Sequence, residues 1–380
     1  MQYREFGKLG FKISTFGFGC MRLPVIDGES SKIDEKEAIS MIRHAIDSGV
    51  NYFDTAYVYH QGNSELLVAK ALKDGYRDRI KLATKLPSWL VKTHEDFDRF
   101  LDEQLCKLET DHIDFYLIHG LDRDRWQQMK VLRIFEFIEK AKKSGRIIHI
   151  GFSFHDGLSA FKEIIDGYDG WEMCQIQLNI IDEDFQAGRE GMMYAAAKGI
   201  PVVVMEPLRG GMITQSVPDD VINVWNEGGF KRSPAEWAFK WVCNFPQVTV
   251  VLSGVSTMEQ LDDNIKIFEN ALPCTMSENE LAIIGKVQDI YRSRMNVGCT
   301  GCSYCMPCPS GVAIPAVFKM YNDAKVFGKV EMSREFYAGL ISSGSDASHC
   351  IECASCESIC PQHISVIEKL KEARAFLSVK

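Results

Sequence analysis

Two hydrophobic periods alternate along most of the chain. Between about residues 13 and 270, short apolar runs typical of buried strands are separated by longer stretches in which apolar residues recur every three or four positions, as on one face of a helix. We predict strands at Phe16–Cys20, Tyr52–Asp54, Ile80–Lys85, Ile113–Ile118, His149–Phe152, Cys174–Leu178, Pro201–Met205 and Thr249–Ser253. We predict helices between them at Asp34–Ser48, Ser64–Lys73, Glu95–Leu108, Val131–Ser144, Leu158–Ile165, Arg189–Lys198, Pro234–Cys243 and Met258–Asn270.

This eightfold alternation predicts an α/β fold, specifically a closed (β/α)8 barrel of the TIM type in which a loop follows each strand at one rim. An open doubly wound sheet is the alternative. Such a sheet usually carries a glycine-rich phosphate turn after its first strand, and Gly17-Phe18-Gly19-Cys20 lacks that spacing. Ahead of the barrel, Tyr3–Phe6 and Phe11–Ser14 alternate like a hairpin that would close the barrel bottom.

The composition changes sharply after residue 298. Eight of the 13 cysteines lie from Cys299 onward. Helical periodicity runs through Glu278–Arg294 and returns at Ile314–Val326 and Ser333–Ile341. We therefore predict two domains, a barrel over residues 1–295 and a mainly α-helical, ferredoxin-like iron–sulfur domain over residues 296–380.

The charge and the longest apolar stretches limit where the protein acts and what it binds. The 380 residues carry 43 Lys and Arg against 52 Asp and Glu, a net charge of −9, which disfavours nucleic acid or an anionic membrane surface as a partner. No apolar stretch approaches the roughly 18 residues of a membrane-spanning helix. The first residues lack the apolar core of a secretory signal, so we expect a cytoplasmic protein.

Ionisable residues stand at the ends of three consecutive predicted strands. Asp54 ends the second strand, Lys85 ends the third, His119 follows the fourth, and Tyr59 comes five residues after Asp54. In a barrel of this type these positions meet at one rim. A lysine beside a tyrosine lowers the pKa of the phenol, a carboxylate keeps that lysine charged, and a histidine opposite hydrogen-bonds a substrate carbonyl. Each residue alone is more often a turn or packing residue, but together they predict a pocket that protonates a carbonyl compound.

Four motifs carry a resemblance to a known family. They are Asp54-Thr55-Ala56-x-x-Tyr59, Gly62-Asn63-Ser64-Glu65, Ala83-Thr84-Lys85 and Asp114-Phe115-Tyr116-Leu117-Ile118-His119. In these motifs roughly residues 1–290 resemble the aldo-keto reductase superfamily. The resemblance implies an NAD(P)(H)-dependent oxidoreductase acting on a small carbonyl compound or alcohol. Tyr59 would be the general acid/base, Asp54 and Lys85 would tune it, and His119 would orient the carbonyl.

The same resemblance implies the contacts of a nicotinamide cofactor. Ser153 and Gln175 would hold the nicotinamide amide, although Phe154 stands where the family has Asn. Two loops would cover the pyrophosphate and hold the adenosine phosphate. The implied set is Gly19, Cys20, Met21, Asp54, Ser153, Gln175, Glu206, Pro207, Leu208, Gly210, Gly254, Ser256, Gln260, Asp263 and Asn264. The family favours NADP slightly over NAD, but no Lys or Arg lies between Ser253 and Asn264 to pair with a 2′-phosphate.

Further side chains near the predicted rim are candidates for the wall of the substrate pocket. They are Arg22, Tyr57, His60 and Trp89.

The C-terminal cysteines form two runs of four. The first run is Cys299, Cys302, Cys305 and Cys308, and the second is Cys350, Cys353, Cys356 and Cys360. The second run has bacterial-ferredoxin spacing, in which the fourth cysteine ligates the neighbouring cluster. We therefore predict two 4Fe-4S clusters, one on Cys299, Cys302, Cys305 and Cys360 and the other on Cys350, Cys353, Cys356 and Cys308. Structural zinc is disfavoured because its cysteines usually come in two separated pairs.

Two functions stay open at this point. The first is an oxidoreductase with hydride chemistry in the barrel and electron transfer in the tail. The tail is similar to the dicluster domain that one subgroup of aldo-keto reductases carries. The second is an electron-carrier or redox-sensing subunit whose barrel binds nucleotide but turns over weakly. Nicotinamide moves two electrons and each cluster moves one, so the clusters would serve a redox protein partner, a flavin for which no motif is visible, or the fold of the tail alone.

Overall fold

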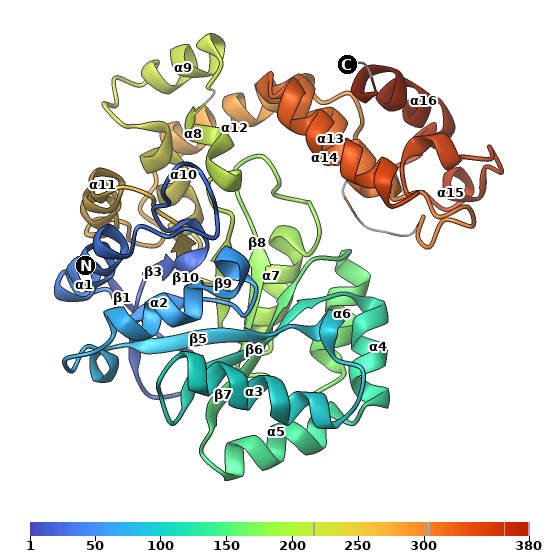
Figure 1. The fold of residues 1–380 in the computed structure, drawn as a ribbon. Coiled ribbons are helices and arrows are strands. Elements are labelled where there is room, and N and C mark those ends of the chain that lie inside the picture. The colour runs from blue at the N-terminus through green and yellow to red at the C-terminus, as the bar shows by residue number, and fades with distance from the viewer. Residues whose placement is uncertain (216, 300, 302–304, 361, 379–380) are drawn as a thin grey trace. The chain divides into compact units, whose positions relative to one another are not determined.

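The computed structural model describes residues 1–380 except 216, 300, 302–304, 361 and 379–380 (Figure 1). The chain divides into two compact units, each assembled from several segments. Unit 1 comprises Met1–Asn179, Ala187–Leu208 and Ala238–Met276, and unit 2 comprises Ile180–Gln186, Arg209–Trp237 and Ser277–Lys380. Unit 2 thus includes two segments that lie between strands of the barrel in sequence. The predicted domain boundary at residue 295 stays a prediction.

Unit 1 contains the closed eight-stranded parallel barrel that the sequence predicts. Its strands are β3 (Phe16–Gly19), β4 (Tyr52–Asp54), β5 (Lys81–Leu86), β6 (Ile113–Leu121), β7 (Ile147–Phe154), β8 (Met173–Gln177), β9 (Val202–Met205) and β10 (Val248–Ser253). They pair in the order β10-β3-β4-β5-β6-β7-β8-β9, and the pairing of β10 with β3 closes the sheet. Closure leaves no strand edge of the barrel unpaired, so no edge needs protection from other chains. The strands are continuously apolar because both of their faces are buried.

Amphipathic helices alternate with these strands (Figure 1). They are α1 (Glu35–Asp47), α2 (Ser64–Ala71), α3 (Glu95–Lys107), α4 (Arg123–Val131), α5 (Ile134–Lys143), α6 (Leu158–Asp166), α7 (Gly188–Ala197), α10 (Pro234–Cys243) and α11 (Met258–Phe268). The single helix predicted at Val131–Ser144 is wrong at its start. Arg133 has a left-handed φ of 62°, which separates α4 from α5.

The N-terminal hairpin also forms as predicted, from β1 (Tyr3–Glu5) and β2 (Lys12–Ser14). Phe6 is fully buried, and its ring centroid lies 4.6 Å from that of Phe115 on β6. Ile13, Tyr52 and other apolar side chains from the lower part of the barrel join the same core. The hairpin therefore fills the end of the barrel at which the strands begin.

Unit 2 contains mainly helices. They are α8 (Met212–Gln215), α9 (Asp219–Asn226), α12 (Glu278–Ser293), α13 (Ile314–Phe327), α14 (Val330–Ser342), α15 (Ser355–Ser358) and α16 (Val366–Leu377). Apolar side chains of α13, α14 and α16 pack into one core, and described cysteines of both runs lie against it. The predicted helices at 278–294, 314–326 and 333–341 are confirmed within a few residues, whereas α16 was not predicted.

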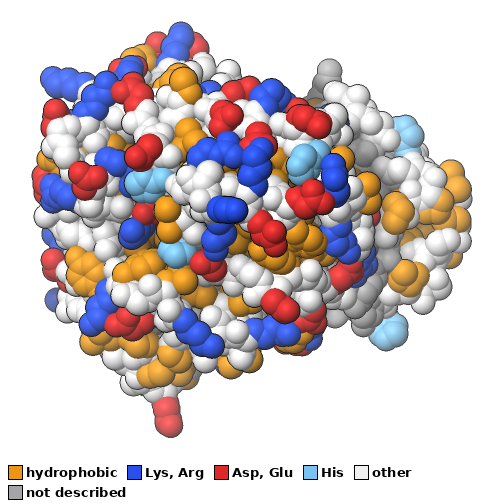
Figure 2. All heavy atoms as spheres, turned by 90° about the horizontal axis from the view of Figure 1, so that it is seen from below, with side chains coloured by type: hydrophobic (Ala, Val, Ile, Leu, Met, Phe, Trp, Pro, Cys, Tyr) orange, Lys and Arg blue, Asp and Glu red, His pale blue; other side chains and the backbone are white. Residues whose placement is uncertain are grey.

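None of the described helices is long and apolar enough to cross a membrane. On the face drawn in Figure 2, Lys and Arg side chains are interspersed with Asp and Glu. That face therefore carries mixed charge rather than a field of one sign.

Candidate active site

The ends of β4, β5 and β6 bring the predicted reacting groups to one rim of unit 1. The register of the parallel strands aligns Asp54 with Ala83 on β5, and Lys85 with Leu117 on β6. Because all strands of the barrel run the same way, the residues at these positions share the C-terminal rim.

Asp54, Lys85 and Tyr59 form a connected hydrogen-bonded group. Lys85 Nζ donates to Asp54 Oδ1 at 2.5 Å, to the Thr55 carbonyl at 2.8 Å and to the Tyr59 hydroxyl at 3.1 Å. The side chains of Lys85 and Asp54 are 1% and 3% exposed. All three ammonium donor positions are thereby used, so the lysine is fixed in the orientation that points it at the phenol.

Burial and the ion pair set the charge of Lys85. Burial alone would lower the pKa of Lys85, but the Asp54 carboxylate and the Tyr59 oxygen outweigh it and raise the pKa above its ordinary value. For Asp54 the directions are reversed: burial raises the pKa of its carboxyl group, and the charge of Lys85 lowers it by a smaller amount. The lysine therefore stays an ammonium ion beside the phenol.

The pKa of Tyr59 moves opposite to the sequence-based prediction. Burial raises it above 10, Lys85 lowers it by a smaller amount, and Asp54 raises it further. The expected net lowering was wrong because it counted the neighbouring cation and left out desolvation. A raised pKa keeps the phenol protonated at neutral pH, which suits a proton donor.

His119 faces this group across the rim. Its ring centroid lies 6.1 Å from that of Tyr59, edge-on, and 5.0 Å from that of Trp89. Burial lowers the pKa of His119 well below its ordinary value, and the nearby Lys85, His155 and Arg125 lower it further. Within the described part of the chain its buried Nδ1 has no hydrogen-bond partner. The imidazole is therefore neutral and carries one ring N–H.

A strand irregularity orients His119. β6 does not stop at Ile118 as predicted but continues to Leu121, and its pairing with β7 shifts register between these two residues. Gly120 lies in this bulge with a φ of 61°. Bulges re-aim a side chain beside a functional site, and the sequence signal for this one was only the glycine.

A buried polar network that the sequence analysis missed supports Lys85 from behind. Gln104 on α3 donates from Nε2 to Glu65 Oε1 at 2.7 Å and to the Lys85 carbonyl at 3.1 Å. Tyr116 donates to Gln104 Oε1 at 2.8 Å, and Thr84 donates to Glu65 Oε1 at 2.7 Å. One sequence signal could have revealed this network. Gln104 follows Phe100 and Leu101 by four and three residues, so it lies on the same apolar face of the helix.

The predicted nicotinamide contacts lie side by side on neighbouring strands. Ser153 on β7 pairs in register with Gln175 on β8. Both are buried, and Gln175 Oε1 has no hydrogen-bond partner among the described residues, so it is free to accept from a carboxamide N–H. Ser153 Oγ accepts from the Gly120 amide at 2.8 Å. Phe154 stands in place of the family Asn and turns into the core, where its ring centroid lies 5.1 Å from that of Phe161. It therefore offers no hydrogen bond to a nicotinamide amide.

The predicted adenosine-phosphate segment leads into α11. The Ser256 amide donates to Gln260 Oε1 at 2.9 Å, and Asn264 Nδ2 donates to Ser253 Oγ at 3.0 Å. Ser256 Oγ donates to the Arg22 carbonyl at 2.8 Å, and a Cβ on Gly254 would lie 2.9 Å from Arg22 Cγ. The carbonyl and the carbon stem of Arg22, in the turn after β3, thus lie against this segment.

The remaining implied cofactor residues fall in three places. Cys20 is fully buried and Met21 is exposed in the turn after β3, where Gly19 ends the strand. Glu206 has a left-handed φ of 54°, and its carbonyl accepts from Asn179 Nδ2 at 3.3 Å. Pro207 and Leu208 complete the part of this loop that belongs to unit 1, and Gly210 belongs to unit 2. Asp263, on α11, is exposed beside Lys266.

Of the candidates for the substrate wall, Trp89 lies beside His119, whereas both ring nitrogens of His60 have partners within the protein. His60 is buried, its Nδ1 lies 2.7 Å from the Ser30 carbonyl, and its Nε2 accepts from the Leu23 amide at 3.3 Å. It therefore holds the loop after β3 rather than facing a ligand. The hydroxyl of Tyr57 is likewise used, in a bond to Glu103 Oε2 at 2.9 Å.

Described cysteines of both runs in unit 2 lie against one helical core. The charge of Cys353 in the second run acts to raise the pKa of Cys308 in the first run, whereas Cys350 and Cys356, which also interact, belong to the same run. Cys299, Cys305 and Cys360 are described, whereas Cys302 and Pro361 lie outside the described residues. Within the described ranges, no three metal-ligating side chains converge at single-ion distances.

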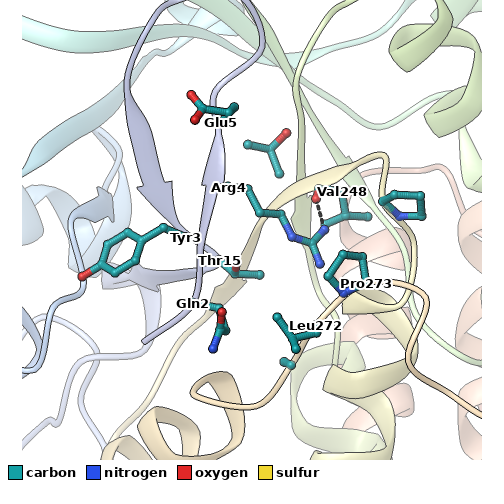
Figure 3. A pocket seen from close by; sticks show the side chains of 11 residues that line it. Gln2, Tyr3, Arg4, Glu5, Thr15, Val248, Leu272 and Pro273 are labelled. Atoms are coloured by element: carbon teal, nitrogen blue, oxygen red, sulfur yellow. Dashed lines mark hydrogen bonds between the residues drawn. The ribbon is translucent and has the colours of Figure 1, made fainter.

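A cavity of about 330 Å³ lies elsewhere in unit 1, where the strands begin (Figure 3). The Arg4 guanidinium in its wall donates to the carbonyls of Cys243 at 2.5 Å, Phe245 at 3.0 Å and Val248. It thereby satisfies the carbonyls at the end of α10 and the start of β10. The cavity contains none of the predicted site residues.

Comparisons with known proteins agree with this geometry. The aldo/keto reductase family profile matches residues 15–280, and the 4Fe-4S dicluster domain profile matches residues 298–365. A probable aldo-keto reductase 1 from Glycine max is 27% identical over 314 residues, covering 73% of this chain and 86% of that protein. L-galactose dehydrogenase from Arabidopsis thaliana is 24% identical over 290 residues, covering 70% of this chain and 87% of that protein. The structure of an aldo-keto reductase from Bacillus halodurans, in its holo form, matches with a TM-score of 0.62 at 25% identity, covering 76% of this chain and 96% of that one.

Proposed function

Because the chain belongs to the aldo/keto reductase family and carries a C-terminal 4Fe-4S dicluster domain, we propose that it reduces a small carbonyl compound, or oxidises the corresponding alcohol, with NAD(P)(H). The single observation that carries the proposal is the buried Asp54–Lys85 pair hydrogen-bonded to the Tyr59 hydroxyl. A nicotinamide cofactor, when bound, supplies or accepts the hydride.

Each residue then has a defined role at the carbonyl. The Tyr59 hydroxyl donates its proton to the carbonyl oxygen as negative charge develops there. Lys85 stabilises the phenolate that remains, and Asp54 holds Lys85 charged and in place. The neutral His119 donates its ring N–H to the same oxygen and orients the carbonyl. In alcohol oxidation the same groups run in reverse, with Tyr59 as the base.

Two observations support nicotinamide binding at this rim. Gln175 presents a buried carbonyl oxygen without a partner among the described residues, and this matches a carboxamide donor. The carbon stem of Arg22 lies against Gly254, in the segment proposed to hold the adenosine phosphate, and we propose that its guanidinium pairs with that phosphate. Ser153 would complete the grip on the amide, and the remaining implied cofactor residues keep their proposed roles.

We further propose that the eight cysteines from Cys299 to Cys360 hold two 4Fe-4S clusters that transfer electrons to or from a redox protein partner. The donor set fits this cofactor because it consists of eight thiols, the last four of them in bacterial-ferredoxin spacing, and described cysteines of both runs lie against one core.

Rapid mixing of NADH or NADPH with the anaerobically purified protein and an aldehyde tests the barrel chemistry. We expect aldehyde-dependent oxidation of the nucleotide that Tyr59→Phe slows by about 10²- to 10⁴-fold, the usual contribution of general acid catalysis. The matched control is Tyr57→Phe, which removes the hydroxyl of a tyrosine bonded to Glu103 instead. Equal rates for the two variants would refute the role of Tyr59. Oxidation that does not depend on aldehyde would favour the electron-carrier alternative.

A further inference from the structure

A buried carboxyl group with no role in the proposed reaction lies behind the reacting groups of unit 1. Glu65 is fully buried in the first turn of α2, and its Oε1 accepts from Thr84 and from Gln104, each at 2.7 Å. Lys107 Nζ lies 3.8 Å from the other carboxyl oxygen. A buried carboxyl group needs partners for its oxygens, so it constrains the residues that supply them.

Glu65 acts on the backbone of Lys85 through Gln104. The Gln104 nitrogen that donates to Glu65 also donates to the Lys85 carbonyl at 3.1 Å. Tyr116 donates to Gln104 Oε1 at 2.8 Å. Because the amide oxygen is thereby engaged, the amide nitrogen must face Glu65 and Lys85. Gln104 and Tyr116 are fully buried, so these bonds are shielded from water and hold their partners firmly.

The neighbouring residue of α2 acts on the other end of Lys85. The hydroxyls of Ser64 and Thr55 lie 2.8 Å apart, and Ser64 Oγ also donates to the Cys20 carbonyl at 3.2 Å. The Thr55 carbonyl in turn accepts from Lys85 Nζ at 2.8 Å. The first two residues of α2 therefore hold Lys85 at both its ammonium group and its backbone.

The same helix directly follows the turn that carries Tyr59. Left-handed φ values of 51°, 55° and 92° follow this tyrosine at His60, Gln61 and Gly62. Residues other than glycine adopt such values only where their surroundings determine the conformation. The path of the turn, and with it the place of the Tyr59 hydroxyl, therefore depends on where α2 begins.

We propose that Glu65 and Gln104 are positioning residues for the contact between the lysine ammonium group and the tyrosine hydroxyl. This inference rests on the proposed function. Helix α2 is joined by hydrogen bonds to both ends of Lys85 and by the chain to Tyr59, so a shift of the helix against β5 changes the 3.1 Å contact between them. Ser64 completes the same link from the ammonium side. Buried contacts outside the site thus hold the proton donor and the cation that stabilises its phenolate at one separation.

Turnover of the anaerobic holoprotein in both directions tests this positioning. We expect Gln104→Met to lower kcat for carbonyl reduction by about 10²-fold, the usual loss when a reacting group is displaced by about 1 Å. Methionine fills the volume of glutamine but makes none of its hydrogen bonds. The affinity for the nucleotide, titrated by fluorescence, should stay unchanged, because the proposed amide contacts Ser153 and Gln175 lie on β7 and β8.

The same variant should move the pH profile of alcohol oxidation. Burial raises the pKa of Tyr59, Lys85 lowers it, and Asp54 and Cys20 raise it further. His119, which faces Tyr59, is neutral. A displaced Lys85 loses its lowering effect, so the pKa of Tyr59 rises again and the profile moves to higher pH. A variant that is merely less stable would lose rate without moving the profile.

A conservative variant and a matched control sharpen the test. Glu65→Gln keeps an acceptor oxygen for Gln104 and Thr84, so it should keep most of the rate that Glu65→Leu loses. The control is Gln288→Met, which removes a buried glutamine that donates to Glu183 in unit 2 at 2.9 Å. It should leave kcat and the pH profile unaltered.

Equal kcat values and equal pH profiles for Gln104→Met and Gln288→Met would overturn the positioning role while leaving the proposed function intact. Lower turnover with an unmoved profile would overturn it as well. If Gln104→Met does not fold, Thr84→Val decides by the same criteria, because it removes the hydroxyl that donates to Glu65. A wild-type protein without aldehyde-dependent oxidation of the nucleotide would overturn the proposed function, and this inference with it.

Discussion

The two candidate cofactor regions of this chain are built in opposite ways. In unit 1, Asp54, Tyr59, Lys85 and His119 come from three strands and a loop, and only the register of the parallel barrel brings them together. In unit 2, the candidate ligands come from two short runs in which each cysteine follows the last by three or four positions. The first site therefore depends on the whole barrel, and the second depends mainly on local spacing.

This contrast predicts different responses to substitution. In the barrel, the reacting groups are buried, charged and mutually dependent, so the loss of one leaves another uncompensated. In the tail, each cysteine is replaceable without stranding a buried charge, and the expected loss is confined to one cluster.

The largest effect is expected for Lys85→Met. It leaves the Asp54 carboxylate buried without its partner, which should lower the free energy of unfolding by about 3–5 kcal/mol in addition to removing the group that stabilises the phenolate. Denaturant unfolding and steady-state carbonyl reduction measure the two effects. The double variant Asp54→Asn/Lys85→Met should regain stability without regaining activity.

The control for this prediction is Lys70→Met. Lys70 pairs with Glu35 on an exposed surface, and such pairs contribute less than about 1 kcal/mol. Equal stabilities of the Lys70 and Lys85 variants would show that the buried pair is not fully charged, and would remove the electrostatic basis of the proposed mechanism.

A smaller and more local effect is expected for Cys353→Ala. Iron should fall from about eight to about four atoms per chain because one 4Fe-4S cluster loses a ligand. Cys308→Ala should remove the same cluster, since the predicted ligand set assigns Cys308 and Cys353 to one cluster, whereas Cys299→Ala should remove the other. Cys106→Ala, at an exposed cysteine on α3, is the control. Iron analysis and EPR distinguish the outcomes, and loss of different clusters in the Cys308 and Cys353 variants would refute the ligand assignment.

The mildest test is the pH dependence of turnover in the two directions. Tyr59 has a pKa raised above 10, so its protonated form persists through neutral pH and carbonyl reduction should stay level until the pH approaches that value. Alcohol oxidation needs the deprotonated form and should rise about tenfold per pH unit below the same pKa. Because the pKa of His119 is lowered well below 6.5, neither direction should lose rate through its protonation near neutral pH. A reduction rate that falls between pH 7 and 9 would contradict the raised pKa of Tyr59.

Most of the barrel could be predicted because its strands are short, continuously apolar and separated by amphipathic helices. Three of the four rim residues could be placed for the same reason, since Asp54 and Lys85 stand at or next to strand ends and His119 lies in the last three residues of β6. The helix break at Arg133 and the bulge around Gly120 could not be predicted. Each depends on one or two backbone angles that the surrounding packing selects.

The sequence by itself determined the order of strands and helices, the identity of the groups at the rim and the spacing of the cysteines. These are properties of residues near one another in the chain. Tertiary structure alone decided the raised pKa of Tyr59, the support of Lys85 by Gln104, and the pairing of Arg209 with Asp182 and Asp323. Desolvation and charge pairing depend on residues that are distant in sequence, so no local pattern of residues encodes them.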